Sequence, residues 1–280
     1  MIRIRSWAKI NLHLQVASKR EDGYHCLQTV FARVSLHDDV FIEAKREPVV
    51  ELFVNGGGGV PHGPKNIAFK AARWYLNRFK INWGVKIIIN KRIPPGSGLG
   101  AGSSNAGAVI RGLAQFFGEW DPKVVVEAVS LGADVPFFIM DVPFAYAEGV
   151  GEVMEVIEPE RGFDEKIALL YPGFGVSTKE AFELFDAEEK SDLSLLSKDE
   201  IISTFKSSDW ESMSRLFFNH LEVPVFKKHP ELAQNKKFLK EKGALFSLMS
   251  GSGSTVYGIF GEEIKLEPPS GGEVFWCEFI

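Results

Sequence analysis

The chain carries at residues 96–104 the stretch Gly96-Ser97-Gly98-Leu99-Gly100-Ala101-Gly102-Ser103-Ser104, set between a strand-type run and a helix-type run. Glycine makes up only 27 of the 280 residues, so four glycines at alternate positions are rare by chance. Glycines let the backbone turn sharply and bring several N–H groups toward one ligand. At the start of a helix, those groups and the helix dipole favour an anion such as phosphate. The stretch therefore predicts a phosphate-binding loop.

Composition and charge argue against a nucleic-acid or membrane partner. The net charge is −5 and no dense basic block occurs, whereas duplex binding depends on clustered lysines and arginines. No apolar run is long enough to span a bilayer, and the N-terminus does not resemble a signal peptide. The two cysteines, Cys26 and Cys277, lack metal-type spacing and fit free thiols in a reducing compartment. We therefore expect a cytoplasmic protein with a small-molecule partner; the oligomeric state is left open.

Apolar periodicity predicts strands first and mixed helices and strands afterwards, which is typical of an α+β protein of two domains. Strands are expected over 2–16 and, as a meander interrupted at His37-Asp38-Asp39, over 27–54. Residues 186–200 form a charged, loop-like insertion, and a polar break at 158–162 places the domain boundary near residue 160. The other expected elements are a helix beginning at Asn66, a strand over 84–90, a helix over 105–117 capped by Ser103 or Ser104 and ended by Gly118, a helix from 121 to about 131, a strand over 166–171, a helix beginning at Ser177, helices over 199–206, 211–221 and 230–242, and strands over 245–249, 255–260 and 273–279.

Three familiar types of glycine motif do not fit the residues. A P-loop needs a lysine between the last glycine and the serine, and Ser103 follows Gly102 directly. Gly96, Gly98 and Ala101 satisfy the looser dinucleotide pattern, but a second helix follows where that fold needs a strand. The protein-kinase triplets His-Arg-Asp and Asp-Phe-Gly do not occur. Spacing alone leaves a phosphate loop of another type or a purely structural glycine turn.

The stretch over residues 94–106 resembles the second motif of the GHMP kinase superfamily, whose members phosphorylate small alcohols and acids. Segments 8–12, 22–31, 131–138 and 147–152 are similar to those of the members that phosphorylate 4-diphosphocytidyl-2-C-methyl-D-erythritol. Residues 249–256 resemble the third motif of the superfamily. Because these matches run in the expected order, the resemblance covers nearly the whole chain.

The resemblance implies the α+β, two-domain GHMP kinase fold. Residues 1–160 would form an ATP-binding domain like domain 2 of ribosomal protein S5, and residues 161–280 a ferredoxin-like domain. It implies ATP-dependent phosphorylation of the 2-hydroxyl of that acceptor, in the non-mevalonate route to isoprenoids, with substrate in a cleft between the domains. The alternatives are another small-molecule kinase of the superfamily, of the homoserine or mevalonate type, and a member that binds ligand without turnover.

Two residues match the positions that the resemblance makes catalytic. Asp134 would accept the proton of the attacking hydroxyl, although an aspartate before Val135-Pro136 is by itself more often a cap or turn residue. Lys9 would keep that carboxylate ionised and polarise the hydroxyl, although a strand lysine is more often solvated.

Five residues match substrate-binding positions by the same resemblance: Asn11, Tyr24, His25, Phe31 and Phe182. An aromatic ring can stack on a pyrimidine, and an imidazole or amide can bind its polar edge. Core packing is the alternative for the aromatic residues.

The ATP-binding positions implied by the resemblance include the loop and two residues outside it. Ser103 or Ser104 would reach Mg²⁺ through a hydroxyl, and Asn66 and Lys91 match positions near the nucleoside. Their alternatives are a helix cap and a solvated lysine at a strand end. The loop positions are Pro94, Pro95, Gly96, Ser97, Gly98, Leu99, Gly100, Ala101, Gly102, Ser103 and Ser104.

Some positions depart from the pattern of the superfamily. Ser97 and Ala101 replace glycines of many relatives, but both are small enough for the loop to form. His220 stands where an aspartate is more common, in Asn219-His220-Leu221-Glu222, and we expect it to be a surface histidine on a helix.

Overall fold

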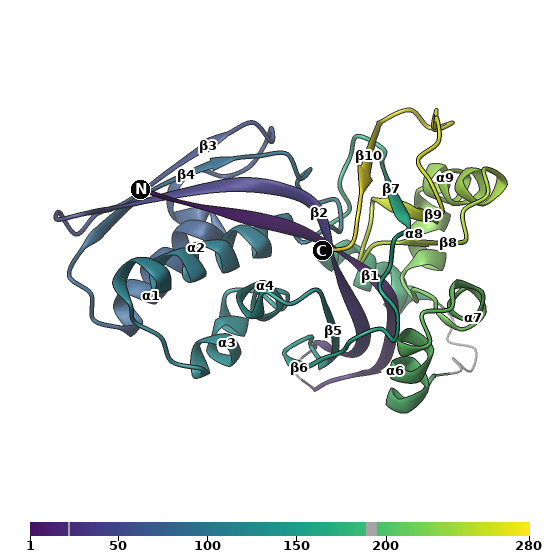
Figure 1. Ribbon diagram of the computed structural model, residues 1–280, viewed down its shortest axis with the longest axis horizontal. Helices are drawn as coiled ribbons and strands as arrows, with labels where there is room; N and C mark the ends of the chain where they lie inside the picture. The colour runs from purple at the N-terminus through teal and green to yellow at the C-terminus, as the bar shows by residue number, and fades with distance from the viewer. Residues whose placement is uncertain (22, 189–194) are drawn as a thin grey trace. The chain divides into compact units, whose positions relative to one another are not determined.

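The computed structural model describes residues 1–21, 23–188 and 195–280 (Figure 1). Part of the expected insertion at 186–200 therefore lies outside the described residues. The chain divides into two compact units, neither of them contiguous in sequence. Unit 1 comprises residues 1–8, 36–95 and 100–142, and unit 2 comprises residues 9–35, 96–99 and 143–280. The expected boundary near residue 160 stays a prediction.

Two long strands, β1 (Ile2–Lys19) and β2 (His25–Lys45), contribute residues to both units. The expected interruption at His37-Asp38-Asp39 is wrong, because β2 continues through these residues. The buried Asp38 carboxylate accepts hydrogen bonds from the backbone N–H groups of Arg92 and Ile93, at 2.7 and 2.9 Å. A buried polar side chain with such partners does not need a turn to reach water.

Unit 1 is a small sheet with helices on one face (Figure 1). Residues 39–45 of β2 pair antiparallel with β4 (Gly84–Asn90), which pairs in parallel with β3 (Val50–Asn55). The helices α1 (Ile67–Arg78) and α2 (Ala101–Phe117) share a buried core with these strands. The shorter helices α3 (Lys123–Glu127) and α4 (Val135–Met140) follow, with single 3-10 turns η1 (Gly63–Lys65) and η2 (Ala128–Ser130). The helix expected from 121 to 131 is thus shorter than predicted.

Helix α2 packs closely on both of its sides because two of its residues are glycines. A Cβ at Gly112 would lie 2.4 Å from Cδ1 of Ile42 on β2, and one at Gly107 would lie 2.6 Å from Cβ of Phe138 on α4. The helix begins at Ala101, four residues earlier than predicted; its N-cap is the left-handed Gly100 (φ +73°), and no side chain caps it. It ends at the left-handed Gly118, which confirms that prediction.

Unit 2 contains two sheet segments. Residues 27–32 of β2 pair with β5 (Phe144–Gly149), which pairs with β6 (Val153–Val156). A separate antiparallel sheet consists of β7 (Lys166–Tyr171), β8 (Phe246–Met249), β9 (Val256–Phe260) and β10 (Glu273–Cys277). Its strands lie side by side in the order β10-β7-β9-β8. In chain order this is 4-1-3-2, as expected for a ferredoxin-like domain, but residues 261–272, between β9 and β10, contain no helix.

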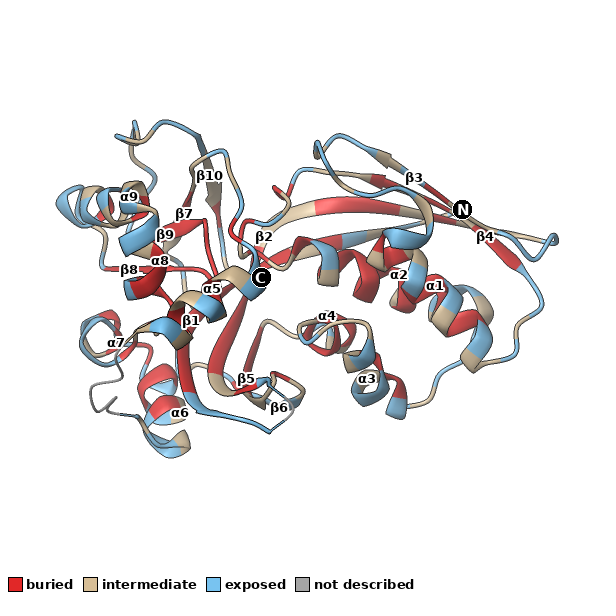
Figure 2. Cartoon of the chain, turned by 180° about the vertical axis from the view of Figure 1, so that it is seen from behind, coloured by how far each residue is buried: buried red, intermediate tan, exposed pale blue. Residues whose placement is uncertain are grey.

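Among the described residues of unit 2, five helices lie between β7 and β8 in the chain, and α8 and α9 share a core with the sheet. Figure 2 shows β8 buried throughout and α9 exposed along its outer face. The expected helix over 211–221 is wrong beyond Leu216, because Phe217 is extended and Asn219 bridges to Leu14. These helices are α5 (Thr178–Ala187), α6 (Lys198–Lys206), α7 (Trp210–Leu216), α8 (Glu222–Lys228) and α9 (Pro230–Glu241).

In the part of the chain that the structure describes, no helix is both long and apolar enough to cross a membrane. Neither Cys26 nor Cys277 takes part in a disulfide bond among the described residues.

Candidate active site

Lys9 is buried in unit 2, so the alternative of a solvated strand lysine is wrong. The residue is only 3% exposed. Its ammonium group donates a hydrogen bond to Asn11 Oδ1 at 2.6 Å and lies 5.5 Å from the centre of the Phe31 ring. The Asn11 amide is oriented by Thr29, whose hydroxyl donates to the His13 carbonyl and therefore accepts from Asn11 Nδ2 at 2.8 Å. Three of the expected residues, Lys9, Asn11 and Phe31, thus form one cluster.

The first half of the glycine stretch, Gly96–Leu99, belongs to unit 2 and is fixed to the segment that follows β8. The Thr255 N–H donates to the Ser97 carbonyl at 3.0 Å, and the Ser250 hydroxyl donates to the Gly98 carbonyl at 2.9 Å. A Cβ at Gly98 would lie 2.0 Å from the Ser250 carbonyl oxygen, so only glycine fits there. The Lys9 N–H donates to the Leu99 carbonyl at 3.1 Å, which joins this half of the loop to β1.

The second half of the stretch, from Gly100 onward, belongs to unit 1 and forms the first turn of α2. The Ser104 hydroxyl donates to the Trp7 carbonyl at 2.6 Å and lies 2.7 Å from Ser6 Oγ. Its hydrogen bonds are therefore made to other groups of the protein. Ser103 is half-buried. Of the two candidate Mg²⁺ ligands, Ser103 is therefore the better placed.

The described residues contain no group of three or more His, Cys, Asp or Glu side chains that could hold a metal ion. This is compatible with Mg²⁺, which keeps several waters and takes few protein oxygens together with substrate phosphates. A serine hydroxyl at the start of a phosphate loop suits that chemistry.

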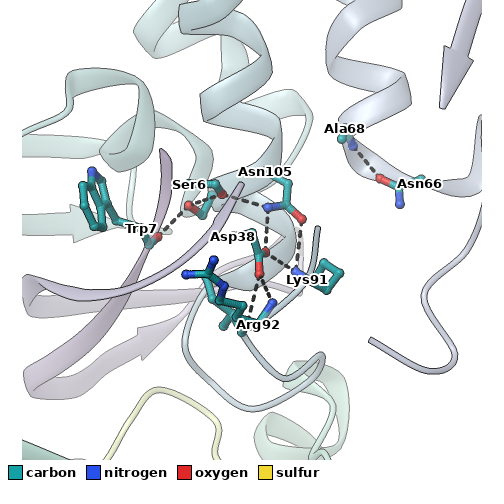
Figure 3. Close-up of polar contacts among 10 residues, drawn as sticks. Ser6, Trp7, Asp38, Asn66, Ala68, Lys91, Arg92 and Asn105 are labelled. Carbon is teal, nitrogen blue, oxygen red and sulfur yellow. Dashed lines mark hydrogen bonds and ion pairs between the residues drawn. The ribbon is translucent and has the colours of Figure 1, made fainter. Parts of the chain in front are cut away.

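Lys91 is buried beneath the start of α2, and its alternative as a solvated strand-end lysine is wrong. Its ammonium forms an ion pair with Asp38 and donates to Asn105 Oδ1 at 3.1 Å (Figure 3). Asn105 Nδ2 in turn donates to Asp38 Oδ2 and to Ser6 Oγ, both at 2.8 Å. The network connects β1, β2, the end of β4 and α2, while the expected nucleoside contact of Lys91 stays a prediction.

Asn66 caps α1 as its alternative interpretation requires. Its side chain accepts from the Ala68 N–H and donates to the Pro61 carbonyl, both at 2.8 Å. Asp134 precedes α4 in the capping position, but its side chain makes no capping hydrogen bond there. Asp134 therefore lies in a turn, as its alternative interpretation allows, although its side chain does not cap α4; its catalytic role stays a prediction.

His25 and Phe182 are brought together in unit 2, with stacked rings whose centres lie 4.8 Å apart. His25 Nε2 lies 2.9 Å from Asp186 Oδ1, and Asp186 also pairs with Lys19. The hydrogen bond from Lys19, and then that from His25, lowers the pKa of Asp186. At this spacing no third ring fits between the two, and the expected substrate contacts of His25 and Phe182 stay predictions. Tyr24 is 65% exposed, so core packing does not explain it.

Two histidines belong to the segments that meet at the contact between β1 and residues 218–220: His13, which is buried, and His220, which is partly buried. Burial lowers the pKa of His13 to about 3 and the pKa of His220 to about 4, so both are neutral at pH 7. The expectation of a surface helical His220 is wrong, because the residue precedes α8 and its Nδ1 accepts from the Val16 N–H at 3.0 Å. Its ring stacks on Phe218 at 4.5 Å.

Sequence reasoning missed Asp186, Asp38 and Asn219. Asp186 follows Phe182 by four residues on α5 and thus shares its helix face, which is a detectable signal. In the sequence, Asp38 indicates only a break in a strand. Asn219 belongs to a segment already singled out for its histidine.

Comparison with known proteins places these features in a family. Residues 45–149 match the model described as GHMP kinases N terminal domain, and residues 201–268 match GHMP kinases C terminal. The chain is 40% identical over 264 residues to a 4-diphosphocytidyl-2-C-methyl-D-erythritol kinase of Desulfotalea psychrophila, covering 92% of this chain and 85% of that one. A crystal structure of 4-(cytidine 5'-diphospho)-2C-methyl-D-erythritol kinase is similar with a TM-score of 0.77 and 32% identity, over 99% and 98% of the two chains. A crystal structure of homoserine kinase from Cytophaga hutchinsonii is similar with a TM-score of 0.70 and 16% identity, over 99% of this chain and 95% of that one. At this identity the similarity shows the fold alone.

Proposed function

Because the chain belongs to the GHMP kinases and, within them, to the 4-diphosphocytidyl-2-C-methyl-D-erythritol kinase family, we propose that it transfers the γ-phosphoryl group of ATP to the 2-hydroxyl of that cytidyl alcohol. The reaction serves the non-mevalonate route to isoprenoid precursors. We further propose that it takes place in the cytoplasm, with Mg²⁺ bound to the nucleotide.

The observation that carries the proposal is the buried ammonium of Lys9, held by Asn11 beside Phe31 and the Gly98 segment. Burying a lysine is costly, and a protein that only binds a neutral ligand gains nothing from it. Phosphoryl transfer, in contrast, depends on positive charge placed where negative charge accumulates on the transferred group. Lys9 supplies that charge to the phosphoryl group and the attacking hydroxyl.

In the chemical step the substrate 2-hydroxyl oxygen forms a bond to the γ-phosphorus, the bond from that phosphorus to the ADP oxygen breaks, and the proton passes to Asp134. The backbone N–H groups of residues 96–102 and the N-terminus of α2 hold the phosphates. Ser103 would provide a hydroxyl ligand for Mg²⁺, and the ion would supply positive charge that neutralises the nucleotide phosphates.

The cytosine end of the acceptor is assigned to the cluster of Tyr24, His25 and Phe182. Phe182 offers a stacking face, and the His25 ring is held by Asp186 at 2.9 Å, so its orientation is fixed before substrate arrives. A ring in a fixed orientation can distinguish the polar edge of a pyrimidine. Homoserine and mevalonate have no group that would use such a cluster.

The test is ADP release measured in parallel with the cytidyl alcohol, homoserine and mevalonate as acceptors. We expect turnover with the first acceptor alone. Clear turnover with homoserine or mevalonate and none with the cytidyl alcohol would overturn the substrate assignment, and ligand binding without ADP release from any acceptor would establish a non-catalytic member. Asp134→Asn is expected to lower kcat by ~10²–10⁴-fold, the usual contribution of an acid–base group, and near-full activity would exclude that role.

A further inference from the structure

The segment Phe218-Asn219-His220 in unit 2 runs beside β1, the strand that carries Lys9. The Leu14 N–H donates to the Phe218 carbonyl at 2.8 Å, and the His220 N–H donates to the Leu14 carbonyl at 3.0 Å. Together with the bond from Val16 to the His220 ring, these contacts fix the backbone of Asn219 relative to β1.

The buried side chain of Asn219 uses both N–H groups and its oxygen. Nδ2 donates to the carbonyls of Met249 and Gly251, at 2.8 and 2.7 Å, and Oδ1 accepts from the Leu221 N–H at 2.9 Å. Only an amide of this length supplies two donors and one acceptor at one point, since aspartate has no donor and alanine has neither. The residue therefore connects β1 to the loop that follows β8.

The loop at residues 250–251 lies against both the Lys9 side chain and the glycine stretch at Gly98. A Cβ built on Gly251 would lie 3.2 Å from the Lys9 ammonium nitrogen, 3.3 Å from Asn11 Oδ1 and 3.3 Å from the Gly98 carbonyl oxygen. The neighbouring Ser250 hydroxyl holds the Gly98 carbonyl at 2.9 Å. The Gly251 backbone thus lies close both to the Lys9 ammonium and to Gly98, in the first half of the glycine stretch, and acts as a spacer between them.

We propose that Asn219 is a positioning residue for phosphoryl transfer: by holding the Gly251 carbonyl it sets the place of the Lys9 ammonium relative to Gly98. This inference rests on the proposed function, in which Lys9 and the glycine stretch act on the same phosphoryl group. Loss of the two donors releases the Met249 and Gly251 carbonyls and lets the spacer move. A displacement of about 1 Å at a reacting centre can cost about 10²-fold in rate.

The experiment compares Asn219→Ala and Asn219→Asp with Asn235→Ala, a matched control. Asn235 is also a buried asparagine of unit 2, on α9, and its oxygen accepts from Ser270 at 2.7 Å. Single-turnover rates are measured by rapid quench at saturating ATP and cytidyl alcohol, well below each melting temperature. We expect the Asn219 variants to lose about 10–100-fold in rate while KM for the cytidyl alcohol changes little, and the control to keep its rate even where its melting temperature falls equally.

Amide hydrogen exchange gives a readout that does not depend on turnover. Residues 97–99 and 250–255 should exchange faster in Asn219→Ala but not in Asn235→Ala. If the wild-type protein releases no ADP with any acceptor, the proposed function fails while this measurement still tests the inference. If Asn219→Ala does not fold, Asn219→Ser, which retains one donor, replaces it. Wild-type rate and exchange in a folded Asn219 variant, or equal losses in the control, would overturn the proposal.

Discussion

The buried ion pair between Asp38 and Lys91 gives the most direct test of what holds unit 1 together. Asp38→Asn preserves the shape of the side chain and removes its charge. The amide oxygen can still accept from the Arg92 and Ile93 N–H groups, which both bind Oδ1. The new NH₂ group, however, replaces Oδ2 and then faces two donors, the Lys91 ammonium and the Asn105 amide.

The size of the effect follows from burial. The Asp38 and Lys91 side chains are 0% and 3% exposed, so water cannot replace the lost partner. Removing one member of a buried pair leaves an uncompensated charge and typically costs about 3–5 kcal/mol. We therefore expect Asp38→Asn to lower the free energy of unfolding by about 3–5 kcal/mol. Adding Lys91→Met should restore part of the loss, with a coupling of about 1–3 kcal/mol between the two sites.

The assay is urea unfolding at pH 7, monitored by tryptophan fluorescence and circular dichroism. The free energies of unfolding of the variants are compared with one shared value of m, the slope of that free energy against urea concentration. The control is Asp39→Asn, in the next residue of β2. Its carboxylate is itself only 7% exposed, but its partners Arg3 and Arg92 are more than half exposed, so water can hydrate the charges that remain. The expected loss is therefore only about 1 kcal/mol. A loss for Asp38→Asn no larger than that for Asp39→Asn would refute the reasoning, as would strictly additive effects of Asp38→Asn and Lys91→Met.

Three further predictions concern the glycine loop, the stacked residue Phe182 and the partly buried His220. Gly98→Ala would place a Cβ 2.0 Å from a backbone oxygen at φ +79°, so kcat/KM for ATP should fall about 10²-fold, whereas Gly162→Ala, with nothing within 4 Å, should leave it unchanged. Phe182→Ala should raise KM for the cytidyl alcohol about 5–100-fold, the usual worth of one stacked base, with KM for ATP unchanged; parallel changes in both constants would contradict the assignment. Because burial lowers the His220 pKa from 6.5 to about 4, the unfolded chain binds more protons below pH 6.5, so this residue should reduce stability by about 1–2 kcal/mol as the pH falls to 5. His220→Asn should make the stability curve flatter between pH 6.5 and 4, whereas His62→Asn, at an exposed position, should not; an unchanged curve for His220→Asn would argue against a neutral His220 ring.

Local signals in the sequence predicted local structure well. Asn66 caps α1, Gly118 ends α2, and β4 has the bounds that its apolar run indicates. Each of these features depends on residues within one or two turns of one another. The start of α2 was missed because Gly100 begins it through its left-handed backbone, and no capping side chain marks the position.

Features that depend on distant residues were not predictable in this way. The pair Asp38 and Lys91 is 53 residues apart, so two adjacent aspartates in a β-rich segment looked like a turn. Resemblance identified Lys9 as a candidate, but its burial depends on Asn11, Phe31 and a loop near residue 251. The partners of Asn219 are 30 and 32 residues away on a loop whose own pattern resembles a simple turn.

The discontinuous course of unit 2 has a consequence for the nascent chain. During synthesis, the Gly251 backbone that lies beside Lys9 follows it by about 240 residues. At about 5–20 residues per second, that is on the order of 10–50 s of synthesis. Throughout this interval a lysine destined for burial has to remain hydrated on an incomplete strand, beside a glycine stretch whose second anchor has not been made. A product truncated before residue 249 would keep Asp134 and the whole glycine stretch, yet it would have no loop against which to place either Lys9 or Gly98.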